Sequence, residues 1–132
     1  MTPEMIDRIR EVLVPLNPAA VYLFGSAATG RTRPESDLDL AILPTDEVAA
    51  SRILETSIQL AEVLGRDIDL VDLSRSNAVL RKEVLANGRL LYETDRRRRA
   101  EFEMYALSDY ARLNEERAPV LAVLGQALPP DA

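Results

Sequence analysis

The sequence predicts a single α/β (α+β) domain, built on one sheet with helices packed against it. Short apolar runs closed by glycine or proline alternate with longer segments in which apolar residues recur at helical spacing. The chain has 132 residues, of which 47% are hydrophobic, so it can bury a core without disulfides or a structural metal. These patterns do not reveal the order of the strands within the sheet.

Four elements are expected in the first half of the chain. They are a helix between Thr2 and Pro15, a strand at 21–24, a strand at 37–43 and a helix from Asp46 to about Leu64. Thr2 and Asp46 carry side-chain oxygens of the kind that cap helix N-termini, and Gly65 is typical of the position after a helix. The segment 25–36 holds two glycines, a proline and several hydroxyl residues, which predicts a loop.

The second half of the chain continues the alternation. Its elements are a strand at 67–72, a helix capped by Ser74 or Ser76 and ended by Asn87 and Gly88, a short strand at 90–92, and a long helix that Thr94 opens and Pro119 interrupts or ends. A short apolar helix follows. Tyr105 and Tyr110 stand at helical spacing with Phe102 in the long helix, which favours core packing of both tyrosines over a catalytic role.

Composition excludes several classes of function. The chain has no cysteine and no histidine, which rules out disulfides, Cys/His zinc sites and histidine-based catalysis. A metal would need oxygen ligands, which points to Mg²⁺, Mn²⁺ or Ca²⁺. The net charge of −6 argues against duplex nucleic acid as a partner. We expect a cytoplasmic protein with no membrane span, because the N-terminus is unlike a signal peptide and no stretch approaches ~20 apolar residues.

Paired aspartates stand at the start of the second predicted strand. The carboxylates of Asp37 and Asp39, two positions apart, project from one face of that strand. The residues alternating with them face the other way, into a core: Leu38, Leu40 and Ile42. Like charges on one face repel, and a polyvalent cation between them would reverse that cost. The third strand repeats the pattern with Asp67 and Asp69, one of which would join the cluster if the two strands are neighbours.

Gly25 and Ser26 follow the first predicted strand and begin the loop. A glycine there lets backbone N–H groups approach an anion, and a serine hydroxyl adds a donor. Taken alone, a strand with two acids is usually a solvated face, and a Gly-Ser after a strand is usually a turn. Their combination, with a further acid in a later strand, favours a site for Mg²⁺ and a nucleoside triphosphate.

These motifs carry a family resemblance over about the first hundred residues. Gly25-Ser26, ten intervening residues and Asp37-Leu38-Asp39, followed by Ile68-Asp69-Leu70-Val71, resemble the minimal nucleotidyltransferases of the DNA polymerase β superfamily. The similarity is greatest to the MNT antitoxins that are paired with HEPN-domain toxins. It implies a polymerase β-like fold, a small mixed sheet flanked by helices, and it selects Asp69 rather than Asp67 as the third acid.

The resemblance also implies a reaction. MNT antitoxins transfer AMP from ATP to a tyrosine hydroxyl of the partner HEPN ribonuclease toxin, which silences it and releases pyrophosphate. Asp37 and Asp39 would bridge two Mg²⁺ ions, and Asp69 would bind the ion beside the attacking hydroxyl, as ligand or base. Gly25, Ser26 and nearby backbone amides would hold the β- and γ-phosphates.

Several assignments stay open. Arg31 and Arg33 either reach the triphosphate or are solvated loop charges. The run 96–99 of four arginines is either a solvated helix face, paired with Glu101 and Glu103, or a docking patch. We expect residues 1–93 to form the catalytic core and the apolar extension 94–132 to pack on that core or on a partner, either the toxin or a second copy.

Two alternative functions remain at this stage. One is a nucleotidyltransferase acting on a small molecule, of the aminoglycoside-modifying type, although 132 residues leave little room for a substrate domain. The other is a catalytically idle antitoxin that acts by binding alone. The intact acidic cluster of Asp37, Asp39 and Asp69 argues against an idle protein.

Overall fold

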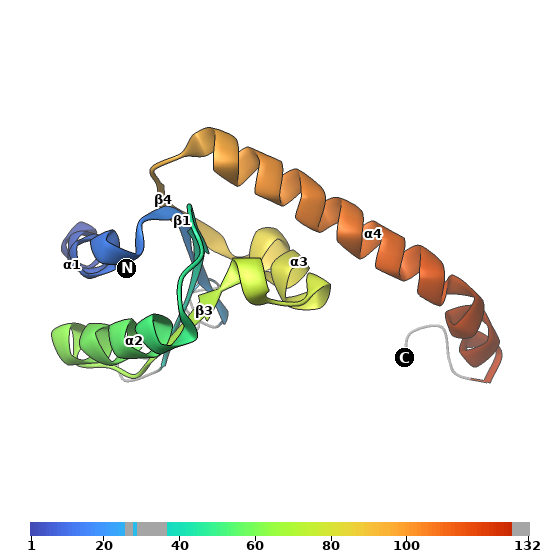
Figure 1. Ribbon diagram of the computed structural model, residues 1–132. Coiled ribbons are helices and arrows are strands. Elements are labelled where there is room, and N and C mark those ends of the chain that lie inside the picture. The colour runs from blue at the N-terminus through green and yellow to red at the C-terminus, as the bar shows by residue number, and fades with distance from the viewer. Residues whose placement is uncertain (26–27, 29–36, 128–132) are drawn as a thin grey trace.

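The computed structural model describes residues 1–25, 28 and 37–127, and the side chains of that set up to residue 115 (Figure 1). The elements run α1 (Pro3–Leu13), η1 (Val14–Leu16), β1 (Pro18–Phe24), β2 (Leu38–Pro44), α2 (Ala50–Leu64), β3 (Ile68–Asp72), η3 (Leu73–Arg75), α3 (Ala78–Asn87), β4 (Arg89–Glu93) and α4 (Arg96–Ala127). The alternation of helices and strands expected from the sequence is therefore confirmed.

The strands form one sheet in the order β3-β2-β1-β4. Strand β1 pairs antiparallel with both β2 and β4, whereas β2 and β3 are parallel. A parallel pair needs a crossover connection, and helix α2 supplies it. The sheet is thus mixed and small, as expected from the family resemblance, and its order places β3 at one edge.

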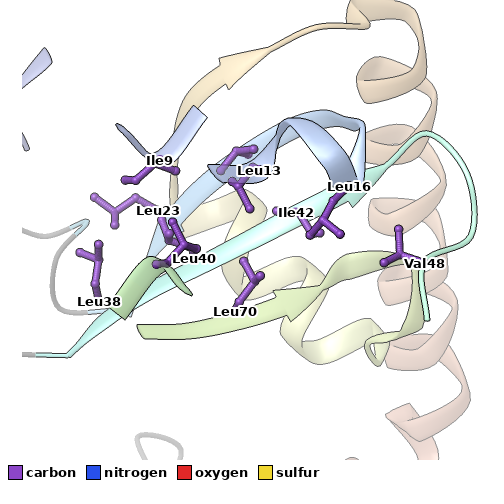
Figure 2. Packing of buried hydrophobic residues seen from close by; sticks show 11 residues of the cluster. Ile9, Leu13, Leu16, Leu23, Leu38, Leu40, Ile42, Val48 and Leu70 are labelled. Carbon is purple, nitrogen blue, oxygen red and sulfur yellow. The ribbon is translucent and has the colours of Figure 1, made fainter. Parts of the chain in front are cut away.

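Helices cover both faces of the sheet. In Figure 1, α1 and α2 lie on one side of the strands, and α3 and α4 lie on the other. The first face buries alternate residues of β1, β2 and β3 against Ile9 and Leu13 of α1, as Figure 2 shows for Leu23, Leu40 and Leu70. The predicted inward orientation of Leu38, Leu40 and Ile42 is confirmed, since all three are buried in this cluster.

The second face carries the attachment of α4. Phe102 and Ala106 pack there with Tyr22 of β1 and Val84 of α3. Beside them, Arg99 pairs with Glu93 and, at 2.8 Å, with Glu103, which also accepts a 2.8 Å hydrogen bond from the Tyr22 hydroxyl. Burial and the bond to Glu103 raise the pKa of Tyr22, so the hydroxyl stays a donor. We call Tyr22, Glu93, Arg99 and Glu103 the anchor cluster.

Helix caps differ from the sequence prediction at three places. Helix α2 begins after Ala49 without a side-chain cap, so Asp46 does not cap it. Helix α3 is capped by Asn77, whose Oδ1 accepts the N–H of Leu80 at 2.8 Å; Ser74 and Ser76 belong to the preceding η3 turn instead. Ahead of α4, Asp95 accepts the N–H of Arg98. Thr94 lies outside that helix, and its hydroxyl donates to the Pro18 carbonyl at 2.7 Å.

Strand and helix limits also differ. Strand β1 begins at Pro18 rather than residue 21, because Ala19 and Ala20 are fully buried and proline is tolerated as the first residue of a strand. Helix α4 continues through Pro119 to Ala127, so the expected interruption is wrong. A single proline removes one backbone hydrogen bond, and helix formers on both sides can carry the helix past it.

The prediction that both tyrosines of the long helix pack in the core is also wrong. Tyr105 is 64% exposed. Tyr110 is partly exposed, and the Lys82 ammonium lies 5.4 Å from the centre of its ring. The face of α4 that meets the sheet contains Phe102 and Ala106, which are four residues apart. Tyr105, three residues after Phe102, lies outside that face.

None of the helices in the described part of the chain is both long and apolar enough to cross a bilayer.

Candidate active site

The acidic residues meet where β2 and β3 begin. In the parallel pairing of these strands Asp39 lies directly opposite Asp69, and the N–H of Leu38 donates to the Asp67 carbonyl at 2.9 Å. Residues directly opposite on neighbouring strands project from the same face, so the carboxylates of Asp39 and Asp69 are adjacent. Asp37 lies just before β2 and is exposed. We call Asp37, Asp39 and Asp69 the acidic cluster.

Electrostatics link the three members of the acidic cluster. Partial burial raises the pKa of Asp39, and the negative charges of Asp69 and Asp37 raise it further. Repulsion of this kind disfavours the ionised state of the central carboxylate. A cation shared by the cluster would act in the opposite direction and favour ionised oxygens as ligands.

Gly25 lies beside the acidic cluster, just after the end of β1, which is the other strand that pairs with β2. It follows Phe24, the residue of β1 that pairs with Asp39. Its φ of 69° lies in the left-handed region, and its carbonyl accepts the N–H of Ala28 at 3.3 Å. A Cβ at this position would overlap Asp39 Oδ2 and stand 3.2 Å from Asp39 Cγ. Glycine is therefore favoured here for two reasons: the left-handed backbone strains other residues, and a side chain would displace the Asp39 carboxylate.

Three predicted site residues lie outside the described residues. They are Ser26, Arg31 and Arg33. Their roles remain predictions.

The donor set of the acidic cluster is of the kind that hard divalent cations such as Mg²⁺, Mn²⁺ and Ca²⁺ take. The cluster offers only carboxylate oxygens, which are the ligands that hard cations prefer. In residues 1–25, 28 and 37–127, no three acidic side chains are close enough to form a complete metal-ligand set. Mg²⁺ commonly uses one or two carboxylates and takes its other ligands from water and substrate phosphates.

Two cavities lie at the opposite end of the sheet from the acidic cluster. One, of about 200 Å³, is lined by residues at the start of β1 and the end of β4, including Pro18, Tyr92 and Thr94. The other, of about 290 Å³, is lined in part by Pro44 at the end of β2 and by Arg98. Neither cavity includes an acid of the cluster. The cluster is exposed at the surface, where Asp37 and Asp69 are both accessible.

The arginines of the run 96–99 do not share one environment. Arg97 pairs with Glu101 at 3.2 Å and is 90% exposed, as expected for a solvated helix face. Arg99 turns inward to the anchor cluster, with its side chain 19% exposed. The pairings with Glu101 and Glu103 predicted from their spacing are thus present. Spacing alone did not reveal the third acid of the group, Glu93, because that contact joins α4 to the end of β4.

Comparison with known proteins identifies the family. The polymerase beta nucleotidyltransferase family matches residues 7–97. The chain is 34% identical over 101 residues to the protein adenylyltransferase MntA of Shewanella oneidensis. The aligned region covers 76% of this chain and 72% of that protein.

Solved structures agree with this assignment. A toxin–antitoxin crystal structure with AMP-PNP matches with a TM-score of 0.78 and 30% identity, over 90% of this chain and 97% of that one. A complex of a tri-AMPylated Shewanella oneidensis HEPN toxin with MNT antitoxin matches with a TM-score of 0.76 and 28% identity, over 94% and 98% of the two chains. The chain therefore belongs to the polymerase beta nucleotidyltransferase family, within which it is similar to the MNT antitoxins.

Proposed function

We propose that this chain is a cytoplasmic, Mg²⁺-dependent protein adenylyltransferase that acts as an antitoxin. It transfers AMP from ATP to a tyrosine hydroxyl of a partner HEPN ribonuclease toxin and so neutralises the toxin. The observation that carries the proposal is the pairing of Asp39 with Asp69 next to Gly25. The named activity of MntA and the AMPylated toxin in the related complex support the choice of reaction and partner.

The reaction exchanges two bonds at the α-phosphorus of ATP. The acceptor oxygen forms a bond to that phosphorus, the bond to the oxygen bridging to the β-phosphate breaks, and pyrophosphate leaves. The acceptor hydroxyl loses its proton to Asp69 or to solvent. Bound magnesium neutralises charge on the triphosphate and favours the ionised acceptor oxygen.

Each residue of the site has a proposed task. Asp37 and Asp39 would hold the magnesium, and Asp69 would serve as a further ligand or as the base for the acceptor hydroxyl. Gly25 and Ser26, with Arg31 and Arg33, hold the phosphates of ATP. Because nucleotidyl transfer depends mainly on positioning and charge neutralisation, a domain of this size is sufficient.

An exposed site suits a protein acceptor. Asp37 and Asp69 are exposed at the surface, and β3 is an edge strand with β2 as its neighbour. A small-molecule substrate is generally bound in a concave pocket that covers most of its surface. The named activity of MntA, a protein adenylyltransferase, supports an acceptor on another protein over a small alcohol.

We further propose that residues 94–132 form an extension of the core 1–93 that also contacts the partner. Phe102 and Ala106 attach α4 to the sheet, while its other side presents Met104, Tyr105 and Leu107, which are 56%, 64% and 50% exposed. In Figure 1 the helix extends well beyond the sheet. Adjacent exposed apolar side chains are typical of protein contacts. Size-exclusion chromatography with light scattering tests this: a monomer both alone and with the toxin present would remove the proposal.

A transfer assay tests the function. The protein is incubated with Mg²⁺, labelled ATP and the product of the adjacent gene, alongside Asp69→Asn and the matched control Asp67→Asn. We expect AMP on a tyrosine of the partner, strongly reduced by Asp69→Asn and retained by Asp67→Asn. Transfer only to a small alcohol would replace the proposal with small-molecule modification. No transfer, with the toxin still neutralised, would indicate an antitoxin that acts by binding alone.

A further inference from the structure

Two glycines of the described chain share a left-handed backbone but differ in their surroundings. Gly25 has a φ of 69° and Gly65 a φ of 66°. A Cβ on Gly65 would meet nothing within 4 Å, whereas a Cβ on Gly25 would overlap the carboxylate of Asp39. The left-handed backbone accounts for glycine at both positions. It does not account for the Asp39 carboxylate, which lies where a side chain at position 25 would be.

The sheet explains why the Asp39 carboxylate lies against Gly25. Asp39 is in β2, between β1 and β3, and it pairs with Phe24 on one side and Asp69 on the other. Gly25 comes directly after Phe24, where the hydrogen bond from Ala28 turns the chain. The carboxylate therefore has the bare Cα of Gly25 on one flank and a like charge on the other.

We propose that Gly25 is a positioning residue for Asp39. Its missing side chain leaves open the space that the Asp39 carboxylate occupies, on the flank opposite Asp69. The inference rests on the proposed function, because it takes Asp39 as a metal ligand. It is separate from the role of Gly25 in phosphate binding, which depends on the backbone N–H and not on the empty space.

Metal affinity is the first test, with Gly65→Ala as the matched control. Both Gly25→Ala and Gly65→Ala force alanine into a left-handed backbone, and both keep the backbone N–H. Mn²⁺ binding is measured by electron paramagnetic resonance without nucleotide. We expect Gly65→Ala to bind as the unsubstituted protein does and Gly25→Ala to bind about 10-fold or more weakly, as is usual when a group that orients a ligand is changed. Equal affinities of the two variants would overturn the proposal.

A double-mutant cycle gives a second readout that needs neither metal nor substrate. In an Asp39→Ala background the nearest neighbour of a Cβ at position 25 is the Cβ at position 39, which lies at 3.5 Å, an ordinary contact. We therefore expect Gly25→Ala to lower the melting temperature clearly less in that background than in the native sequence, while Gly65→Ala lowers it equally in both. Equal losses for Gly25→Ala in the two backgrounds would contradict the proposal, even if the single variant folds poorly.

The cycle also separates the failure of this inference from failure of the proposed function. A protein that transfers no AMP but shows coupling between positions 25 and 39 would refute the adenylyltransferase and keep the steric role. AMP transfer without that coupling, and with unchanged Mn²⁺ binding in Gly25→Ala, would refute the steric role of Gly25 and keep the adenylyltransferase.

Discussion

This domain has two groups of acidic side chains, and the two groups differ in the charges that surround them. In the anchor cluster, Glu93 and Glu103 face each other across Arg99, whose pKa is raised by hydrogen bonds to both. In the acidic cluster, burial raises the pKa of Asp39, and the neighbouring charges that raise it further belong to other carboxylates, Asp69 and Asp37. None of the ion pairs between described residues involves an acid of that cluster.

The difference contrasts acids that hold the fold together with acids whose proposed role is to bind a metal. Arg99 neutralises two acids and fastens α4 to the sheet, which is a structural task. The acidic cluster costs stability in the protein alone, and a cost of this kind is typical of functional sites. The predictions below test this contrast.

Asp39→Asn should have the largest effect. Loss of the central ligand should reduce AMP transfer on the order of 10³-fold, a usual magnitude for groups that stabilise charge in a transition state. The same change removes a repelled charge, so the metal-free protein should unfold at the same or a higher temperature. Labelled-ATP transfer and calorimetry on one sample measure both effects. Lower stability together with lower activity would place Asp39 among the structural acids.

Arg99→Met should have the opposite pattern. It leaves two partly buried carboxylates without their cation, so we expect a loss of about 2 kcal/mol in the free energy of unfolding in urea. Arg97→Met is the matched control, since that pair is highly exposed and should be worth less than about 0.5 kcal/mol. If both variants lose the same stability, the anchor cluster has no special role.

Magnesium should stabilise the protein through the acidic cluster. At a concentration about five times its dissociation constant, a ligand specific for the folded state adds about 1 kcal/mol. We expect thermal unfolding to shift upward with Mg²⁺ in the native sequence and in Arg97→Met, and to stay unchanged in Asp39→Asn. An equal shift in Asp39→Asn would mean that the ion binds elsewhere.

The pH dependence should be the smallest effect, and its sign is the reverse of the usual one for an acid. The pKa of Asp39 is raised above 3.8, so between that value and the folded pKa the native state binds more protons than the unfolded state. Asp39 therefore lowers the free energy of unfolding at neutral pH, and this loss of stability diminishes as the pH falls through the folded pKa. The difference in melting temperature between Asp39→Asn and the native protein should shrink from pH 7 to pH 4 without metal. A constant difference would argue against the repulsion.

The sequence predicted the elements better than their ends. Apolar periodicity was enough to locate the strands and helices, because each buries a regular face. The segment from Asp72 to Asn77 has four possible capping residues, and choosing Asn77 over Ser74 and Ser76 requires the η3 turn, which spacing does not show. Tyr105 was misplaced because three- and four-residue steps both suit a helix, and only the contact with the sheet selects Ala106.

The candidate site was predictable in part. The spacing of Asp37 and Asp39 predicts that they share one strand, whereas Asp37 lies just before β2. Their meeting with Asp69 depends on the strand order, which alternation alone leaves open. The resemblance to a family selected Asp69 over Asp67, and the register now pairs Asp69 with Asp39. The close approach of the Asp39 carboxylate to Gly25 joins β2 to the residue that follows β1, and no sequence pattern reports it.

The position of β3 at the sheet edge has a consequence for access. An incoming protein that approaches from that side meets Asp69 first and Asp39 one strand later, because β3 is the edge strand of the sheet that the described residues form. In the proposed reaction, a tyrosine ring on another folded protein has to reach over only one strand to bring its oxygen to the metal-binding acids. A domain this small can therefore modify a much larger surface without enclosing it.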